Sequence, residues 1–412
     1  MSNISLTARL NLNAIQLRER ITNLGEQIST GRKGNTYAAV GADAPKAMDL
    51  RSEIGRRETY QSTIEQTLSK IKVSQDVLDR IGVIAQKFTA DTAKLLGAAK
   101  PEEIQIQAAQ AKAAMVEVAN LLNEQLNGEY LFGGSDSSNP PIPDPQTIAT
   151  KPGGMGAAII TAVGTLSGSN VAAVLADTKS LAQSNGATVT PFSDFLRTTN
   201  WATSAPYAVG DLVVNNGNTY RVVTAGVSAA AGGPTGTTAG IPDGTVTWDW
   251  VKAGSTAGAT EARTNILGND NDRVEYGIHA NRNAAIVSTG ETTGSWARDL
   301  LRGLASIAGL TPDKAQLGND YTTFVTTVRK GLESSVDALA LERGSLGVNE
   351  TRLQSMASHH ESVSTSLTLQ LSNLEEVDMA KTITSFQTTQ SQLEASYRAL
   401  AISQQLSLTR FL

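Results

Sequence analysis

Few residues in this 412-residue chain have the types and spacing that catalysis or metal binding requires. The three histidines are His279, His359 and His360, and there is no cysteine. Two adjacent histidines cannot share one face of a helix, and the chain has no His-Glu-x-x-His spacing for zinc. The glycine-lysine pattern of a phosphate-binding loop is also absent. We therefore predict no catalytic residue, no metal site and no cofactor, and the residue inventory argues against an enzyme.

Aromatic side chains are the residues with the clearest binding chemistry, and five of them gather within about 50 residues: Trp201, Tyr207, Tyr220, Trp248 and Trp250. An exposed indole ring presents a flat apolar face that can stack on a sugar ring. A small module also needs such residues for its own core, and this second interpretation is favoured. The segment resembles, over a short stretch, Trp-rich β modules of phage tail proteins and carbohydrate-binding domains. The candidate glycan contacts are Trp201, Tyr207, Trp248 and Trp250.

Charge and hydropathy exclude several classes of partner. The net charge of -5 gives no basic surface, so nucleic acid is not expected as a partner. No apolar run is long enough to span a membrane, and the N-terminus lacks the apolar region and cleavage site of a signal peptide. The absence of cysteine is compatible with either redox compartment, so export by a route without a cleaved signal stays open.

An apolar stripe runs through the C-terminal segment from about Asn349 to Leu412. Apolar residues return there every three or four positions and no proline interrupts them, which predicts one long helix with a coiled-coil seam. His360 is expected in this seam and His359 on the solvent side. A helix of ~60 residues would be ~90 Å long, and a compact monomer cannot cover it alone. The stripe therefore needs a partner.

Further helices are predicted at both ends of the chain. In the N-terminal part, helices are expected over residues 5–30, over residues 45–96, and from residue 101 to the turn at Asn127-Gly128. In the C-terminal part, one helix is expected to begin near Ser295, and further helices follow Pro312, with a break near Gly344 to Gly347. Nine of the twelve prolines fall between Pro140 and Pro242, so the middle is expected to be irregular or β-rich. Asn216-Gly217 lies between two strand-like runs and predicts a hairpin, with a further strand from Thr245 to Val251. Residues 150–190 give no firm assignment.

Three blocks near the chain ends resemble the bacterial flagellin superfamily. They are Leu24-Gly-Glu-Gln-Ile-Ser-Thr-Gly-Arg32, the Gly-Glu-Tyr-Leu-Phe-Gly-Gly block at 128–134, and the C-terminal Leu393-Glu-Ala-Ser-Tyr-Arg-Ala-Leu run that continues to Phe411-Leu412. The similarity covers residues 1–140 and 270–412. Within the superfamily, Gly41-Ala-Asp-Ala-Pro-Lys-Ala47 replaces the Asp-Asp-Ala-Ala-Gly-like stretch expected of a filament flagellin, which favours a subunit of the hook–filament junction.

The resemblance implies a mainly α fold, with long antiparallel helices forming a coiled-coil or helical-bundle rod and an inserted β-rich outer domain. It implies three parts: residues 1–45 with 375–412 as the terminal coiled-coil polymer core, 46–135 with 300–374 as a helical rod, and 136–299 as a variable outer insert. The small β module, at about 195–255, would lie within the insert.

The implied function is a structural subunit of the flagellum that polymerises through its terminal helices at the hook–filament junction. Expected partners are further copies of the chain, neighbouring axial proteins, the flagellar export apparatus and an export chaperone, and the expected location is the extracellular flagellum, reached through the export channel. Two alternatives stay open: a flagellin of the filament itself, and an adhesin or fibre protein that binds glycans through the Trp-rich module. The predicted assembly interface consists of Leu6, Leu10, Leu17, Ile21, Leu24, Ile28, Ile383, Phe386, Leu393, Tyr397, Leu400 and Phe411.

Overall fold

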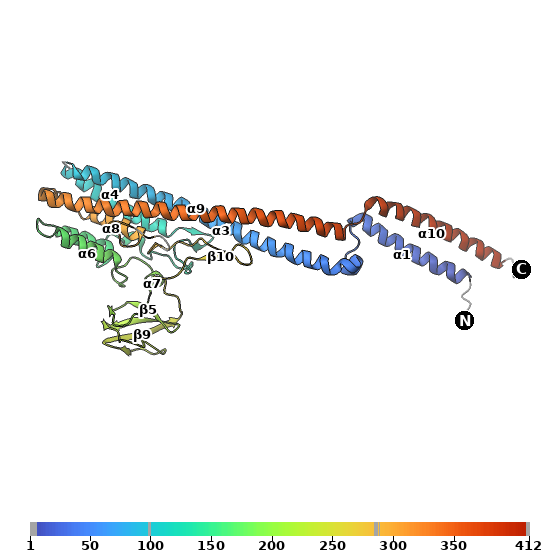
Figure 1. The fold of residues 1–412 in the computed structure, drawn as a ribbon, viewed down its shortest axis with the longest axis horizontal. Coiled ribbons are helices and arrows are strands. Elements are labelled where there is room, and N and C mark those ends of the chain that lie inside the picture. The colour runs from blue at the N-terminus through green and yellow to red at the C-terminus, as the bar shows by residue number, and fades with distance from the viewer. Residues whose placement is uncertain (1–5, 98–99, 284–286, 288, 409–412) are drawn as a thin grey trace. The chain divides into compact units, whose positions relative to one another are not determined.

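The computed structural model describes residues 6–97, 100–283, 287 and 289–408. It is 60% helical, with long helices at both ends of the chain and strands in the middle, which confirms the predicted fold class (Figure 1). The chain divides into two compact units, Met1–Ser62 with Met356–Leu412 and Thr63–Ser355. The division into three parts expected from the sequence stays a prediction.

Two terminal helices dominate the first unit. Helix α1 (Leu6–Thr30) packs along α10 (Met379–Leu408), and the two run antiparallel (Figure 1). The short α2 (Tyr37–Val40) and η1 (Gly41–Asp43) follow α1 and lead into α3 (Ala44–Leu96).

The prediction of one continuous C-terminal helix is wrong. Helix α9 (Asn319–Glu375) ends before α10 begins. The carboxylate of Asp378 accepts a hydrogen bond from the backbone N–H of Lys381 at 3.0 Å, so Asp378 caps the start of a new helix.

The predicted break near Gly344 to Gly347 is also wrong, because α9 is helical throughout this stretch. An isolated helical glycine costs about 1 kcal/mol relative to alanine but does not by itself end a helix. The neighbouring Glu342 and Leu346 are buried, so packing holds the segment helical.

The second unit contains a layer of long helices whose apolar stripes are covered. In α3 the buried apolar residues recur at steps of three, four or seven, as expected of one helix face; they are Ile64, Ile71, Leu78, Ile81, Ala85, Phe88 and Leu95. Helix α8 (Trp296–Ala308) begins where the sequence predicts, since the Ser295 hydroxyl accepts from the backbone N–H of Arg298 at 3.3 Å. Helix α8 packs against α4 (Pro101–Leu122) and is buried along its whole length.

Helix α4 ends earlier than the sequence suggests. Strands β1 (Gln125–Leu126) and β2 (Glu129–Tyr130) pair antiparallel around Asn127 and Gly128, whose φ angles are 55° and 82°. A two-residue turn with two positive φ angles closes a hairpin, and this hairpin takes up residues expected in the helix.

Short helices fill the region that the sequence leaves unassigned. Helices α5 (Met155–Gly164) and α6 (Val171–Gln183) pack against each other and against α8. The remaining short elements are η2 (Pro145–Thr147), α7 (Asp194–Arg197), η3 (Pro312–Leu317) and the antiparallel pair β10 (Asn265–Leu267) and β11 (Arg273–Glu275).

The β module is a five-stranded sheet of order β3-β5-β6-β9-β8. Its hairpin has the predicted turn, with φ of 46° at Asn216 and 75° at Gly217. The core contains Val213, Tyr220, Val222, Ile241, Val246 and Trp248. In the sheet, β3 (Thr199–Asn200) runs parallel to β5 (Leu212–Asn215). The other neighbouring strands pair antiparallel, and they are β6 (Asn218–Thr224), β8 (Ile241–Asp243) and β9 (Val246–Ala253). Strands β4 (Pro206–Tyr207) and β7 (Gly226–Val227) form a separate antiparallel pair.

Candidate assembly interface

Most of the predicted interface residues of α1 and α10 whose side chains are described are only half-buried in the single chain. Those that are half-buried are Leu10, Leu17, Ile21, Leu24, Ile28, Phe386, Leu393 and Leu400. Where the structure describes the side chains of α1 and α10, the buried ones are Ala14, Thr382 and Thr389. The side chain of Leu6 and the whole of Phe411 lie outside the described residues. A pair of helices is therefore too thin to bury its own stripe.

Gly25 of α1 faces the ring of Phe386 of α10. A Cβ atom built on Gly25 would lie 3.9 Å from Cε2 of Phe386, so the ring of Phe386 lies directly over the glycine. Glycine is unfavourable in a helix interior by roughly 0.5–1 kcal/mol relative to alanine. Because 3.9 Å is an ordinary van der Waals distance, an alanine side chain would also fit at this position.

Several large apolar side chains of the terminal pair face solvent. Ile383 and Tyr397, both predicted interface residues, are 40% and 49% exposed. Leu12 and Ile15 share one side of α1, three residues apart, and are 52% and 57% exposed. The prediction omitted these last two, because it followed a single stripe and they lie beside it. Single exposed apolar side chains are common on protein surfaces, whereas contiguous apolar patches mark interaction sites.

Backbone hydrogen bonds tie the end of α1 to the start of α10. Gly31 ends α1 with a φ of 71°, a conformation suited to glycine. Its carbonyl accepts from the N–H of Val377 at 3.0 Å, and the N–H of Lys33 donates to the carbonyl of Glu375 at 2.7 Å. We call residues 31–33 and 374–378 the terminal-helix junction.

Charged side chains reinforce the terminal-helix junction. The carboxylate of Glu375 is 8% exposed and accepts two hydrogen bonds from the guanidinium of Arg51, at 2.9 and 2.8 Å. The ammonium of Lys33 donates to the carbonyl of Leu374 at 2.6 Å. These contacts join segments from opposite ends of the sequence, so no local pattern could have identified them.

The side chain of His360 is packed against other residues in the interior of the first unit. It is buried, as predicted, and its ring stacks on Tyr60 with 5.3 Å between ring centroids. Nη1 of Arg57 lies 3.3 Å from its Nδ1 atom. His359 is exposed, as expected. The residues that the structure describes contain no group of three or more His, Cys, Asp or Glu side chains arranged to hold a metal ion.

The candidate glycan contacts lie in different environments. Trp248 is fully buried in the core of the β module, so its ring is not available for stacking on a sugar. Trp201 and Tyr207 are partly buried against the same core. Trp250 is 37% exposed, and its indole N–H donates to Oδ1 of Asn218 at 3.0 Å. The module thus uses most of its aromatic rings to build itself.

Comparison with known families covers both helical ends. The model of the bacterial flagellin N-terminal helical region matches residues 2–137, and that of the bacterial flagellin C-terminal helical region matches residues 330–412. The two matches together span more than half of the chain, and each includes one of the terminal helices just described. No curated protein matches the chain. The chain belongs to the bacterial flagellin family.

The family defines the general role of this molecule. Flagellins are non-enzymatic structural subunits that are exported and polymerise with themselves into extracellular flagellar structures. In the part of the chain that the structure describes, no helix is both long and apolar enough to cross a membrane.

Proposed function

We propose that this chain is the structural subunit of the hook–filament junction, hook-associated protein 3, and that it polymerises through α1 and α10. Assembly would place these helices against those of neighbouring copies and of the axial proteins above and below. The export apparatus, with an export chaperone, would deliver the subunit through the flagellar channel.

The observation that carries the assembly mechanism is the exposure of apolar side chains on the terminal helix pair. Ile383, Tyr397, Leu12 and Ile15 expose between 40% and 57% of their surface in the single chain. Burying apolar surface is favourable by roughly 25 cal/mol per Å². Contacts among copies would therefore supply a driving force that one chain cannot provide for itself.

The choice of the junction over the filament rests on the segment Gly41 to Ala47, where this chain differs from the pattern expected of a filament flagellin. A flagellin of the filament itself is the alternative. Localisation separates the two. A fluorescently labelled copy at the native locus should form a short collar between hook and filament. Label along the whole filament would refute the junction role and favour the alternative.

Substitutions test the interface itself. Tyr397→Glu and Ile383→Glu place a charge on the exposed apolar face and should prevent incorporation into the flagellum. Gln390→Glu is the matched control, because Gln390 is an exposed polar residue of the same helix and the charge change is identical. Incorporation is measured by the amount of labelled subunit in sheared flagella. Equal incorporation of Tyr397→Glu and the control would contradict the proposed interface.

A further inference from the structure

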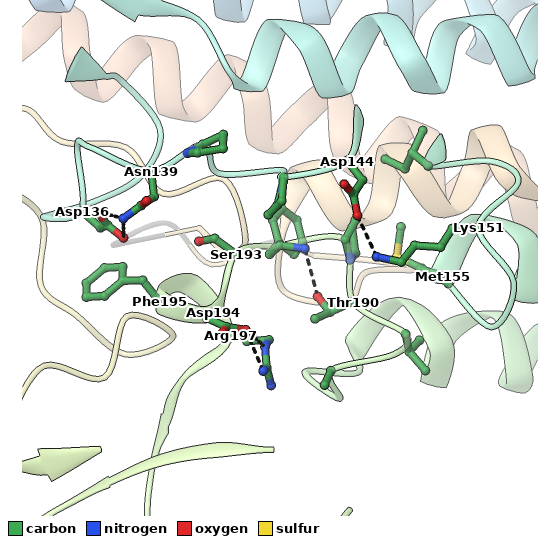
Figure 2. A pocket seen from close by; sticks show the side chains of 18 of the residues that line it. Asp136, Asn139, Asp144, Lys151, Met155, Thr190, Ser193, Asp194, Phe195 and Arg197 are labelled. Atoms are coloured by element: carbon green, nitrogen blue, oxygen red, sulfur yellow. Dashed lines mark hydrogen bonds and ion pairs between the residues drawn. The ribbon is translucent and has the colours of Figure 1, made fainter. Parts of the chain in front are cut away.

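A cavity of about 520 Å³ lies in the second unit, outside the assembly interface (Figure 2). It forms where the loop after β2 and the segment before α5 meet the residues that lead into α7. Small-molecule sites in proteins have volumes of roughly 300–1,000 Å³, and this cavity falls in that range. The proposed assembly through α1 and α10 does not involve the residues that line this cavity.

The charged side chains that line the cavity balance one another. Asp144 is paired with Lys151 at 2.8 Å, and Asp194 is paired with Arg197 at 2.7 Å. The remaining acidic and basic lining residues are Asp136 and Lys252. A lining with equal numbers of positive and negative groups gives no net attraction for a phosphate or another strongly charged ligand. The cavity therefore suits an uncharged molecule.

One end of the cavity combines polar groups with a flat ring. Figure 2 shows Asp136, Asn139, Ser193 and Phe195 around this end. The side-chain amide of Asn139 donates to both carboxylate oxygens of Asp136, at 2.9 and 3.0 Å. Each of these oxygens has a second lone pair, and the amide oxygen of Asn139 is a further acceptor. The ring of Phe195 is half-buried and supplies an apolar face.

Helix α7 holds this end of the cavity in place. The hydroxyl of Ser193 caps the helix, and the backbone N–H of Ser193 donates to the carbonyl of Pro141 at 2.9 Å. The buried Arg197 donates to the carbonyl of Gly210 at 2.9 Å, which joins α7 to the β module. A site fixed before binding loses less conformational entropy when a ligand enters.

We propose that this cavity binds a neutral oligosaccharide. A sugar ring has an apolar face that can pack on Phe195 and edge hydroxyls that can donate to the carboxylate of Asp136 and to the amide oxygen of Asn139. The proposed site lies outside the module's aromatic core. It does not rest on the proposed place of the chain in the flagellum, because binding can be measured on the unpolymerised protein.

The test uses the full-length unpolymerised chain. A glycan array carrying neutral and acidic glycans identifies the class of ligand, and titration calorimetry with the best neutral oligosaccharide measures affinity. Saturable binding of a neutral glycan is expected, weakened about tenfold or more by Phe195→Ala, since a buried aromatic contact commonly contributes at least 1.4 kcal/mol to binding. Trp250→Ala, on the exposed side of the module, should leave the affinity unchanged.

A second variant protects the test against misfolding. Asp136→Asn keeps the size of the side chain and removes its charge, and should weaken binding severalfold while circular dichroism stays as in the parent protein. The proposal would be overturned if the protein bound no neutral glycan or preferred acidic glycans. It would also be overturned if only Trp250→Ala abolished binding, or if both cavity variants bound as tightly as the parent protein.

Discussion

Arg51 and Glu375 form a two-point ion pair that joins the start of α3 to the last residue of α9. The two hydrogen bonds measure 2.9 and 2.8 Å, and the carboxylate is nearly buried whereas the guanidinium is 45% exposed. The backbone of the same glutamate accepts from Lys33 just after α1. Glu375, at the end of α9, thus contacts two other segments, the start of α3 and the residues after α1.

Removing the guanidinium should destabilise this region. Arg51→Ala leaves the carboxylate of Glu375 buried without its main partner, and we expect a loss of about 1–2 kcal/mol in the free energy of unfolding, discounted for the exposure of Arg51. Urea unfolding of the unpolymerised chain, followed by circular dichroism, measures it. Arg56→Ala is the control, because Arg56 pairs with Glu53 on the surface of its own helix. If both variants lowered the free energy of unfolding equally, the Arg51–Glu375 pair would contribute no more to stability than an ordinary surface ion pair.

The terminal helices should be the least protected helices of the free chain. Their described side chains are mostly half-buried or exposed, whereas every residue of α8 is buried. Regions with few buried contacts open most easily. Hydrogen exchange should therefore be fast in α1 and α10 of the monomer, slow in α8, and slow in all three after polymerisation. Equally slow exchange in α1, α10 and α8 of the monomer would contradict the idea that assembly covers the terminal stripe.

Asp243 should be essential to the β module. Its Oδ2 atom accepts from the indole N–H groups of Trp201 and Trp248 at 2.8 and 3.2 Å, and its Oδ1 atom accepts from the backbone of Ala229 at 3.0 Å. Asp243→Ala leaves three donors without an acceptor and should destabilise the module by about 2–4 kcal/mol. Thermal unfolding followed by tryptophan fluorescence detects this. Asp249→Ala, which removes one contact to Gly240, should cost less.

Acid should destabilise the second unit through His279. Burial lowers the pKa of His279 to about 4, and the nearby Arg282 and Arg263 act in the same direction against Glu261. Because the folded pKa lies below the ordinary value of 6.5, the neutral ring is favoured in the folded state. Stability is then full above about pH 6.5 and is lost as the pH falls toward 4, by up to about 3 kcal/mol.

The pH prediction is checked by urea unfolding at several pH values in this range. His279→Gln should remove most of the slope, because glutamine does not titrate. An identical pH dependence in the variant would assign the effect to other groups.

Sequence periodicity determined the helical ends of this protein, and it did so for a physical reason. Apolar residues at steps of three and four define one face of a helix wherever that helix packs, so the buried stripe of α3 could be read directly. The Asn216-Gly217 turn was equally local, because the two residues themselves tolerate the positive φ angles.

Tertiary structure decided the features that depend on distant residues. The break before α10 occurs where Asp378 caps a helix and where Gly31 and Lys33 supply backbone partners, and periodicity runs through it unchanged. The cavity beside Phe195 likewise combines side chains from separate segments. Local patterns report the conformation of a segment, whereas caps, ion pairs and cavities depend on which segments meet in space.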